Sequence, residues 1–144
     1  IIRLATVSPI CGVKEATGEL ERAKTLLDAE LKDFAIYSGD DGTACDFILL
    51  GGHGDISVTA NVVPALMSEM CGLALNKEAD AAKKVDAEIQ DLHRLLFVES
   101  SPIPVKWALE QMGKMPGGLR LPLTALANEN KIELKQALQA SHCL

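Results

Sequence analysis

The sequence has 144 residues, of which 48% are hydrophobic, 24% are charged and only 3% are aromatic, and its formal net charge is −6. An acidic chain without a basic stripe lacks the charges that neutralise phosphates, and few aromatic side chains offer stacking surfaces, which argues against nucleic-acid binding. No apolar run approaches the ~20 residues of a membrane span, so we expect a cytoplasmic protein with no membrane partner. Because it opens with Ile1 and lacks a signal-peptide pattern, we expect it to start inside a longer protein.

The first part of the chain alternates short apolar runs with helical patterns. Strands are predicted at residues 11–16, 34–38 and 55–59, and helices at residues 19–31, 43–50 and 64–75. Strands and helices that alternate at this spacing are typical of parallel βα units in an α/β protein. Three such units cannot close a barrel by themselves.

Beyond residue 76 the pattern becomes helical. Residues 77–96 form a long predicted helix with apolar side chains at spacings of three and four, namely Ala81, Val85, Ile89 and Leu92. Two prolines within residues 100–104 interrupt it, and further helices are predicted at 105–112 and 131–140, separated by a loop and an irregular stretch. The chain therefore divides into an α/β segment, residues 1–76, and a helical domain, residues 77–144.

Lys14 is the candidate nucleophile. In a strand, Gly12, Lys14 and Ala16 share one face, so two small neighbours leave space beside the amine. Inside a barrel this amine would lose hydration, which favours the neutral form that attacks a ketone to give a Schiff base. The alternative is a hydrated lysine at the strand end, in water or paired with Glu19. Glu15, on the opposite face, is expected to be a hydrogen-bonded structural acid.

Two glycine-containing segments follow the later apolar runs. The sequence Ser-Gly-Asp-Asp at 38–41 ends the second predicted strand, where the active sites of barrels gather, and Gly39 would let backbone approach a ligand. Either aspartate could instead cap the next helix. Three glycines surround His53 in residues 51–54, but without a G-K-[ST] or G-x-G-x-x-G pattern they indicate a tight loop with a packed or hydrogen-bonded histidine.

The remaining cysteines and histidines show no metal-binding pattern. No C-x-x-C pair is present, so reduced thiols are expected rather than disulfides or a metal site, which remain the alternatives, at Cys11, Cys45, Cys71 and Cys143. His93 and His142 are isolated in the sequence and are expected at the surface. No carboxylate–histidine cluster is present, and therefore no metal is expected.

Five segments, in this order, resemble the dihydrodipicolinate synthase family, the pyruvate-dependent class I aldolases of lysine and diaminopimelate biosynthesis. They are GVKEATG at 12–18, SGDD at 38–41, GGHG with ISVTAN within 51–61, LFVE with PIPVKWA within 96–108, and LRLPLT at 119–124. The resemblance covers the chain from about Leu4. It implies the last three βα units of a (β/α)8 TIM barrel, followed by a C-terminal helical domain.

The resemblance also implies site residues and partners. Lys14 would be the Schiff-base lysine on the sixth barrel strand, Gly39 would line the same pocket at the end of the seventh, and the backbone around Ile56 on the eighth would contact pyruvate. The parent protein would condense pyruvate with aspartate semialdehyde to give 4-hydroxy-tetrahydrodipicolinate, without a cofactor, as a homotetramer. The alternatives are a related Schiff-base aldolase of the N-acetylneuraminate lyase type and a non-catalytic fragment that acts as an interaction module.

Three departures from the family pattern matter, one of them a loop variation at Ser100 and Ser101, where the family more usually carries Pro and Asn. Asp55 stands where the family usually carries a small apolar residue, and there it could disturb the site or find solvent. The family's tyrosine–threonine proton relay and the arginine for the second substrate are absent, and Tyr37 does not match that tyrosine. We therefore expect the chain alone to be inactive.

Overall fold

The computed structural model describes all 144 residues, which form two compact units. One unit comprises Ile1–Ser57 with Glu69–Lys84, and the other comprises Val58–Ser68 with Val85–Leu144. Helices α3 (Pro64–Leu75) and α4 (Ala79–Leu95) each contribute residues to both units. The predicted division into residues 1–76 and 77–144 follows the change from alternating strands and helices to helices alone, and it stays a prediction.

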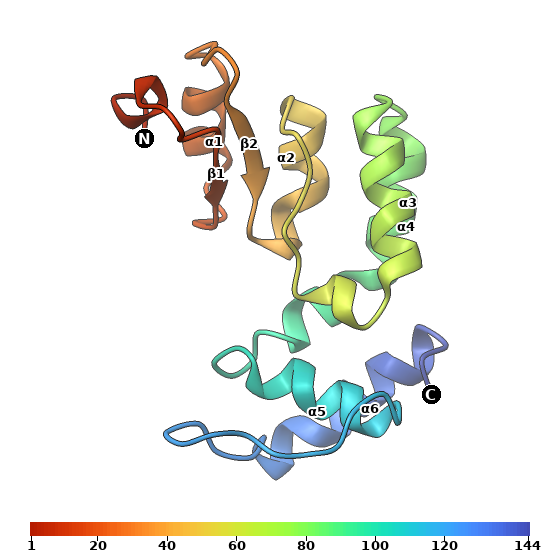
Figure 1. Ribbon diagram of the computed structural model, residues 1–144. Coiled ribbons are helices and arrows are strands. Elements are labelled where there is room, and N and C mark those ends of the chain that lie inside the picture. The colour runs from red at the N-terminus through yellow and green to blue at the C-terminus, as the bar shows by residue number, and fades with distance from the viewer. The chain divides into compact units, whose positions relative to one another are not determined.

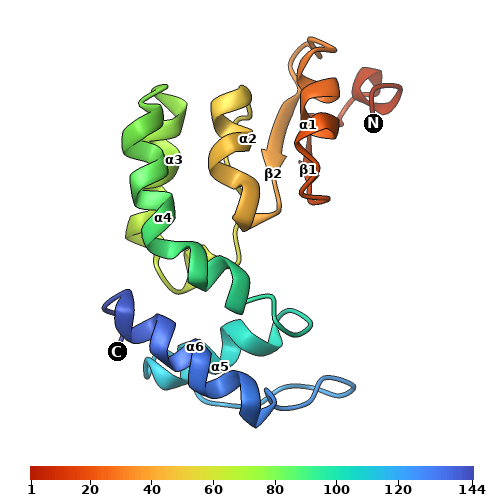
Figure 2. The same ribbon diagram turned by 180° about the vertical axis from the view of Figure 1, so that it is seen from behind.

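The first unit contains a two-stranded parallel sheet, β1 (Gly12–Glu15) and β2 (Ala35–Ser38), with helix α1 (Leu20–Leu27) as the crossover between them. A short 3-10 helix, η2 (Asp41–Thr43), leads from β2 into helix α2 (Ala44–Leu50). Helices α1 and α2 lie behind the strands in Figure 1 and in front of them in Figure 2, so they cover the same face of the sheet. Apolar side chains from the two helices and from β2 fill the space between the layers, including the buried Ala23, Leu26, Ile36, Phe47 and Ile48.

The prediction of a third strand at residues 55–59 is wrong. A single parallel bridge joins Ser38 and Asp55, although three backbone hydrogen bonds of 2.9 Å run along β2, from His53 to Ile36, from Ser38 to Gly54 and from Ile56 to Ser38. The chain then turns into a 3-10 helix, η3 (Thr59–Asn61). Because the chain turns away from β2 soon after Asp55, the ladder stops after one bridge.

The second unit is helical. Helices α5 (Ile103–Gln111) and α6 (Asn128–Ala140) confirm the two later predicted helices, although each begins a few residues before the predicted start. Pro104 sits in the first turn of α5, where its missing N–H breaks no helical hydrogen bond. The core of this unit is formed by fully buried leucines, Leu92, Leu95, Leu96, Leu134 and Leu138.

The structure also bears on thiols and on membranes. No disulfide joins the four cysteines, of which Cys11 is exposed and Cys45 is buried. Burial, followed by the charges of Asp55 and Asp41, raises the pKa of the Cys71 thiol to about 11, so this thiol is protonated at neutral pH.

None of the helices combines the length and the apolar character that crossing a bilayer demands.

The expectation that His93 lies at the surface is wrong, whereas His142 is exposed. The His93 residue is 4% exposed. Its Nδ1 is 2.9 Å from Oγ1 of Thr59, and its Nε2 is 3.5 Å from Oδ1 of Asp86. Thr59 is distant in the sequence, and Asp86 lies on a preceding turn of α4. The sequence around His93 therefore gave no sign that polar groups would lie beside the buried ring.

We predict that Thr59→Val destabilises the chain, because valine keeps the shape of the side chain and removes the hydroxyl group that faces Nδ1 of His93. A buried polar atom left without its partner lowers the free energy of unfolding by about 1–3 kcal/mol. Urea denaturation followed by circular dichroism measures the change. The exposed Thr124 provides a matched control, Thr124→Val, for which the change stays within about 0.5 kcal/mol. Equal effects of the two substitutions would contradict this account.

Candidate active site

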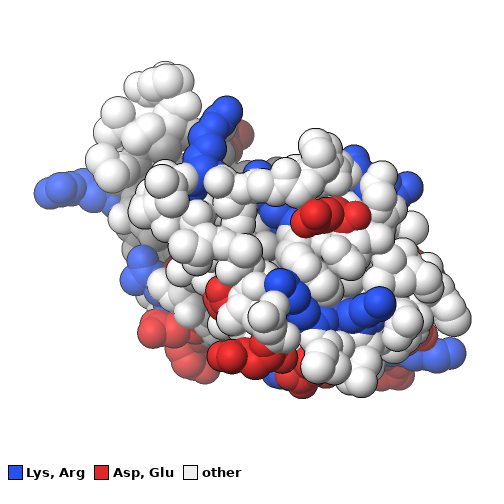
Figure 3. All heavy atoms as spheres, turned by 90° about the horizontal axis from the view of Figure 1, so that it is seen from below, with Lys and Arg blue, Asp and Glu red and all other residues white.

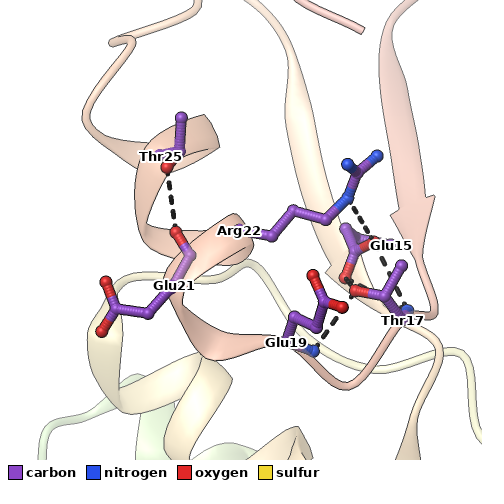
Figure 4. Close-up of polar contacts among 6 residues, drawn as sticks. All are labelled: Glu15, Thr17, Glu19, Glu21, Arg22 and Thr25. Carbon is purple, nitrogen blue, oxygen red and sulfur yellow. Dashed lines mark hydrogen bonds and ion pairs between the residues drawn. The ribbon is translucent and has the colours of Figure 1, made fainter.

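Glu15 fixes the strand that carries Lys14. Its side chain is 4% exposed and lies 3.0 Å from Nε of Arg22, which reaches it from α1. Thr17 donates to the same carboxylate through its hydroxyl group, at 2.9 Å, and through its backbone amide (Figure 4). Glu15 is therefore a hydrogen-bonded structural acid on the helix side, as predicted. Because side chains alternate along a strand, Lys14 points away from the helices.

The turn after β1 extends the same network into α1. The Thr17 hydroxyl group accepts a hydrogen bond of 3.2 Å from the backbone amide of Glu19, the residue before the helix (Figure 4). Gly18 between them has a φ of 73°, a left-handed conformation that favours glycine. Glu21 lies in the first turn of α1, where a negative charge suits the helix dipole. The Thr-Gly-Glu sequence thus sets the direction in which α1 leaves the sheet.

Lys14 and Gly39 lie side by side at the carboxyl end of the sheet. The amide of Gly39 donates a 2.7 Å hydrogen bond to the carbonyl group of Glu15, which continues the pairing of the strands by one residue. A Cβ atom on Gly39 would lie 2.8 Å from Cγ of Lys14 and 2.8 Å from Cβ of Ala16. Glycine at this position therefore provides the room that the Lys14 side chain occupies.

Ile56 falls on the same face as Lys14. Its neighbour Asp55 bridges to Ser38, which is 0% exposed and belongs to the helix side of the sheet. Alternation then places Ile56 on the opposite side, and its residue is 48% exposed. The three residues that the sequence singled out, Lys14, Gly39 and Ile56, consequently share one face of the sheet.

That face is open in this chain. Lys14 is exposed, so the expected loss of hydration around its amine is not met here. Its register partner Tyr37 is 36% exposed on the same face. Lys14 and Tyr37 are exposed because α1 and α2 cover only the other face of the sheet (Figures 1 and 2). The expected loss of hydration requires a closed barrel.

The side chain of Asp55 does not reach solvent, although reaching solvent was one of the two outcomes expected for it. Both of its carboxyl oxygens are buried on the helix side of the sheet. Burial raises the pKa of Asp55 to about 8, and a hydrogen bond with Asp41 and the charge of Asp41 contribute in the same direction. The sequence treated Asp41 only as a pocket or capping residue, and nothing in the spacing of these two acids showed that they meet.

The other polar residues of these loops have structural contacts. Nδ1 of His53 is 3.0 Å from the amide of Ile36, which donates to it, so His53 is a hydrogen-bonded loop residue as predicted. Asp40 makes no capping hydrogen bond with the backbone of η2, but it accepts a 2.7 Å hydrogen bond from the hydroxyl group of Thr43.

The face drawn in Figure 3 shows Lys and Arg at scattered positions beside Asp and Glu, without a continuous basic stripe.

Comparison with known proteins identifies the family. The sequence profile of the Dihydrodipicolinate synthetase family matches residues 1–141. The chain belongs to the dihydrodipicolinate synthetase family. This match includes Lys14, Gly39 and Ile56, the residues that share the open face.

Relatives of known name agree with the family. The chain is 53% identical over 144 residues to 4-hydroxy-tetrahydrodipicolinate synthase of Pseudomonas savastanoi pv. phaseolicola and covers 49% of that protein. It is 55% identical over 138 residues to the synthase of Cellvibrio japonicus and covers 48% of it. A crystal structure of chloride-inhibited dihydrodipicolinate synthase from Acinetobacter baumannii, complexed with pyruvate, matches 99% of this chain and 49% of its own, with a TM-score of 0.96 and 48% identity. The chain thus spans about half the length of the relatives it matches.

We predict that Gly39→Ala destabilises this member of the family, because the added methyl group overlaps the side chains of Lys14 and Ala16. Overpacking of this kind costs about 1–3 kcal/mol. Gly72 in α3 offers the control, since a Cβ atom there meets nothing within 4 Å. Gly72→Ala is expected to raise the free energy of unfolding by about 0.5–1 kcal/mol, because alanine favours the helix. Urea denaturation of both variants checks the two signs, and a neutral Gly39→Ala would contradict the close approach.

Proposed function

We propose that this chain carries the Schiff-base lysine of a 4-hydroxy-tetrahydrodipicolinate synthase, which condenses pyruvate with aspartate semialdehyde. The observation that carries the proposal is the position of Lys14 beside Gly39, on the face of the parallel sheet that the helices leave open. Ile56 lies on the same face, where its backbone can contact a bound keto acid. The names of the relatives, and the pyruvate bound to the Acinetobacter protein, support this choice of substrate class.

The same proposal extends to the fold of the intact protein. The strands β1 and β2 and residues 53–56 would be the sixth, seventh and eighth strands of a (β/α)8 barrel, and residues 77–144 would be the helical domain that follows it. Two facts support this: the chain corresponds to about half of each relative, and its sheet has one uncovered face. The intact protein would assemble as a homotetramer.

The chemistry follows from a lysine amine in a closed pocket. The first half of a barrel would exclude water from Lys14 and favour its neutral form, which adds to the keto carbonyl group of pyruvate with loss of water. The iminium group withdraws electrons, so the adjacent methyl group loses a proton and its carbon attacks the aldehyde of the second substrate. Gly39 leaves the lysine side chain the space to reach the ketone.

Borohydride trapping tests the role of Lys14. When the full-length protein is incubated with pyruvate and sodium borohydride, intact mass and peptide mapping are expected to show one reduced pyruvate adduct, on Lys14. Lys14→Arg should abolish the adduct, because a guanidinium group stays protonated and forms no Schiff base. The exposed Lys24, which pairs with Asp28 at 2.6 Å, gives the control Lys24→Arg, which should retain the adduct. An adduct on another lysine, or none at all, would refute the assignment.

We also predict negligible synthase activity for the 144-residue chain alone. The chain lacks the proton relay that the family resemblance implies, and positioned proton transfer contributes ~10²–10⁴-fold to a rate. The loss of the pocket that orients both substrates lowers the rate further. A steady-state assay that compares the chain with the intact protein at equal concentration measures the difference. Turnover close to that of the intact protein would contradict this prediction.

The alternative, a lyase of the N-acetylneuraminate type, is tested separately. Analysis of the product that the intact protein forms distinguishes the synthase from such a lyase.

A further inference from the structure

Asp41 and Asp55 form a buried carboxyl pair on the helix side of the sheet, opposite the face that carries Lys14. Asp41 begins η2 and is 1% exposed. Asp55 belongs to the segment along β2, and both of its carboxyl oxygens are buried. Neither carboxyl oxygen of Asp55 has another hydrogen-bond partner, and the side chain of Asp41 lies within its hydrogen-bonding reach. Because a carboxylate can only accept hydrogen bonds, such a bond requires a proton on one of the two groups.

The surroundings of the pair keep that proton in place. From α3, Cys71 faces the two carboxyl groups as a neutral thiol, since its own pKa is raised to about 11. From β1, the charge of Lys14 acts in the opposite sense and lowers the pKa of Asp55, as does the backbone amide of Ile56. Burial, the hydrogen bond with Asp41 and the charge of Asp41 outweigh both, and the pKa of Asp55 is raised to about 8. At neutral pH the pair therefore holds one proton and one negative charge.

The pair ties together the two stretches of backbone that form the candidate site. Asp55 lies between two backbone hydrogen bonds to β2, both 2.9 Å long, which Ser38 makes with Gly54 and with Ile56. Asp41 follows Gly39 by two residues, so the carboxyl hydrogen bond links the end of β2 directly to the segment that carries Ile56. Loss of the proton would leave two negative charges in one buried space, and their repulsion would act to separate these stretches.

We propose that Asp55 is a positioning residue: as the neutral partner of Asp41, it holds the Ile56 backbone against the end of β2, and this hold is released when Asp55 loses its proton. The existence of the pair is independent of any function, but its effect on a substrate pocket rests on the function proposed above for Lys14, Gly39 and Ile56.

The first experiment observes the pair in the 144-residue chain. With ¹³C-labelled aspartate, the carboxyl resonance of Asp55 is expected to titrate near pH 8. The protection factor of the Ile56 amide against hydrogen exchange, corrected for intrinsic exchange, should fall over the same range. The free energy of unfolding should fall as the pH rises from about 4 to about 8, because the folded chain holds this proton more tightly than the unfolded chain does.

Three variants separate the pair from general charge effects. Asp55→Asn, a neutral analogue of the protonated acid, should make the Ile56 protection and the unfolding free energy less dependent on pH. Asp41→Asn should move the titration of Asp55 to lower pH, because two causes of the raised pKa are lost. Asp46→Asn removes an exposed carboxylate, paired with Lys83 at 3.2 Å, and should behave as the unsubstituted chain. Titration of Asp55 near pH 4, or a midpoint unchanged by Asp41→Asn, would overturn the proposal even if Asp55→Asn failed to fold.

The second experiment asks whether the pair shapes the pocket, with the full-length protein and borohydride trapping of pyruvate. The ratio of Lys14 adduct in Asp55→Asn to that in the unsubstituted protein should rise up to about tenfold between pH 7 and pH 9, since an acid with a pKa of about 8 is about nine-tenths ionised at pH 9. A ratio that stays constant with pH overturns the positioning role and leaves the proposed function intact. Absence of any adduct on Lys14, in either protein at any pH, overturns the proposed function while the titration of the pair stands.

Discussion

The hydrogen bonds that Glu15 accepts from Thr17 and Arg22 decide the orientation of β1, and the candidate site depends on that orientation. A buried carboxylate is stable only when donors compensate the loss of water, and here the donors come from the turn after the strand and from the next helix. Because Glu15 points toward the helices and side chains alternate along a strand, Lys14 points to the opposite face of the sheet. Glu15, whose side chain lies on the other side of the sheet, thus fixes the direction of the Lys14 side chain.

The two faces of the sheet treat charge differently. On the open face, Lys14 is exposed to solvent beside Gly39. On the helix face, carboxyl groups are withdrawn from solvent, Glu15 against a guanidinium group and Asp55 against a second carboxyl group. Asp55 therefore keeps its proton at neutral pH. Both arrangements act on the site through the backbone and not through contact with a ligand.

The sequence predicted the helices, the parallel strands β1 and β2 and the opposite faces of Lys14 and Glu15, because periodicity and strand alternation are local properties. It failed where distant partners decide the outcome. Residues 55–59 were predicted as a strand, but only Asp55 forms a bridge before the chain turns into η3. The burial of His93 depends on Thr59, 34 residues away, and the fate of Asp55 depends on Asp41. Lys14 is exposed, contrary to expectation, because loss of hydration requires a closed barrel and helices cover only the other face of this sheet.

The sheet order has a consequence for how this half could be completed. Only β1 and β2 pair as strands, so β1 keeps one free rim, and residues 53–56 keep another on the far side of β2. Each rim displays backbone donors and acceptors that seek a complementary strand. A further strand could therefore extend the sheet at either of two edges, beside β1 or beside residues 53–56.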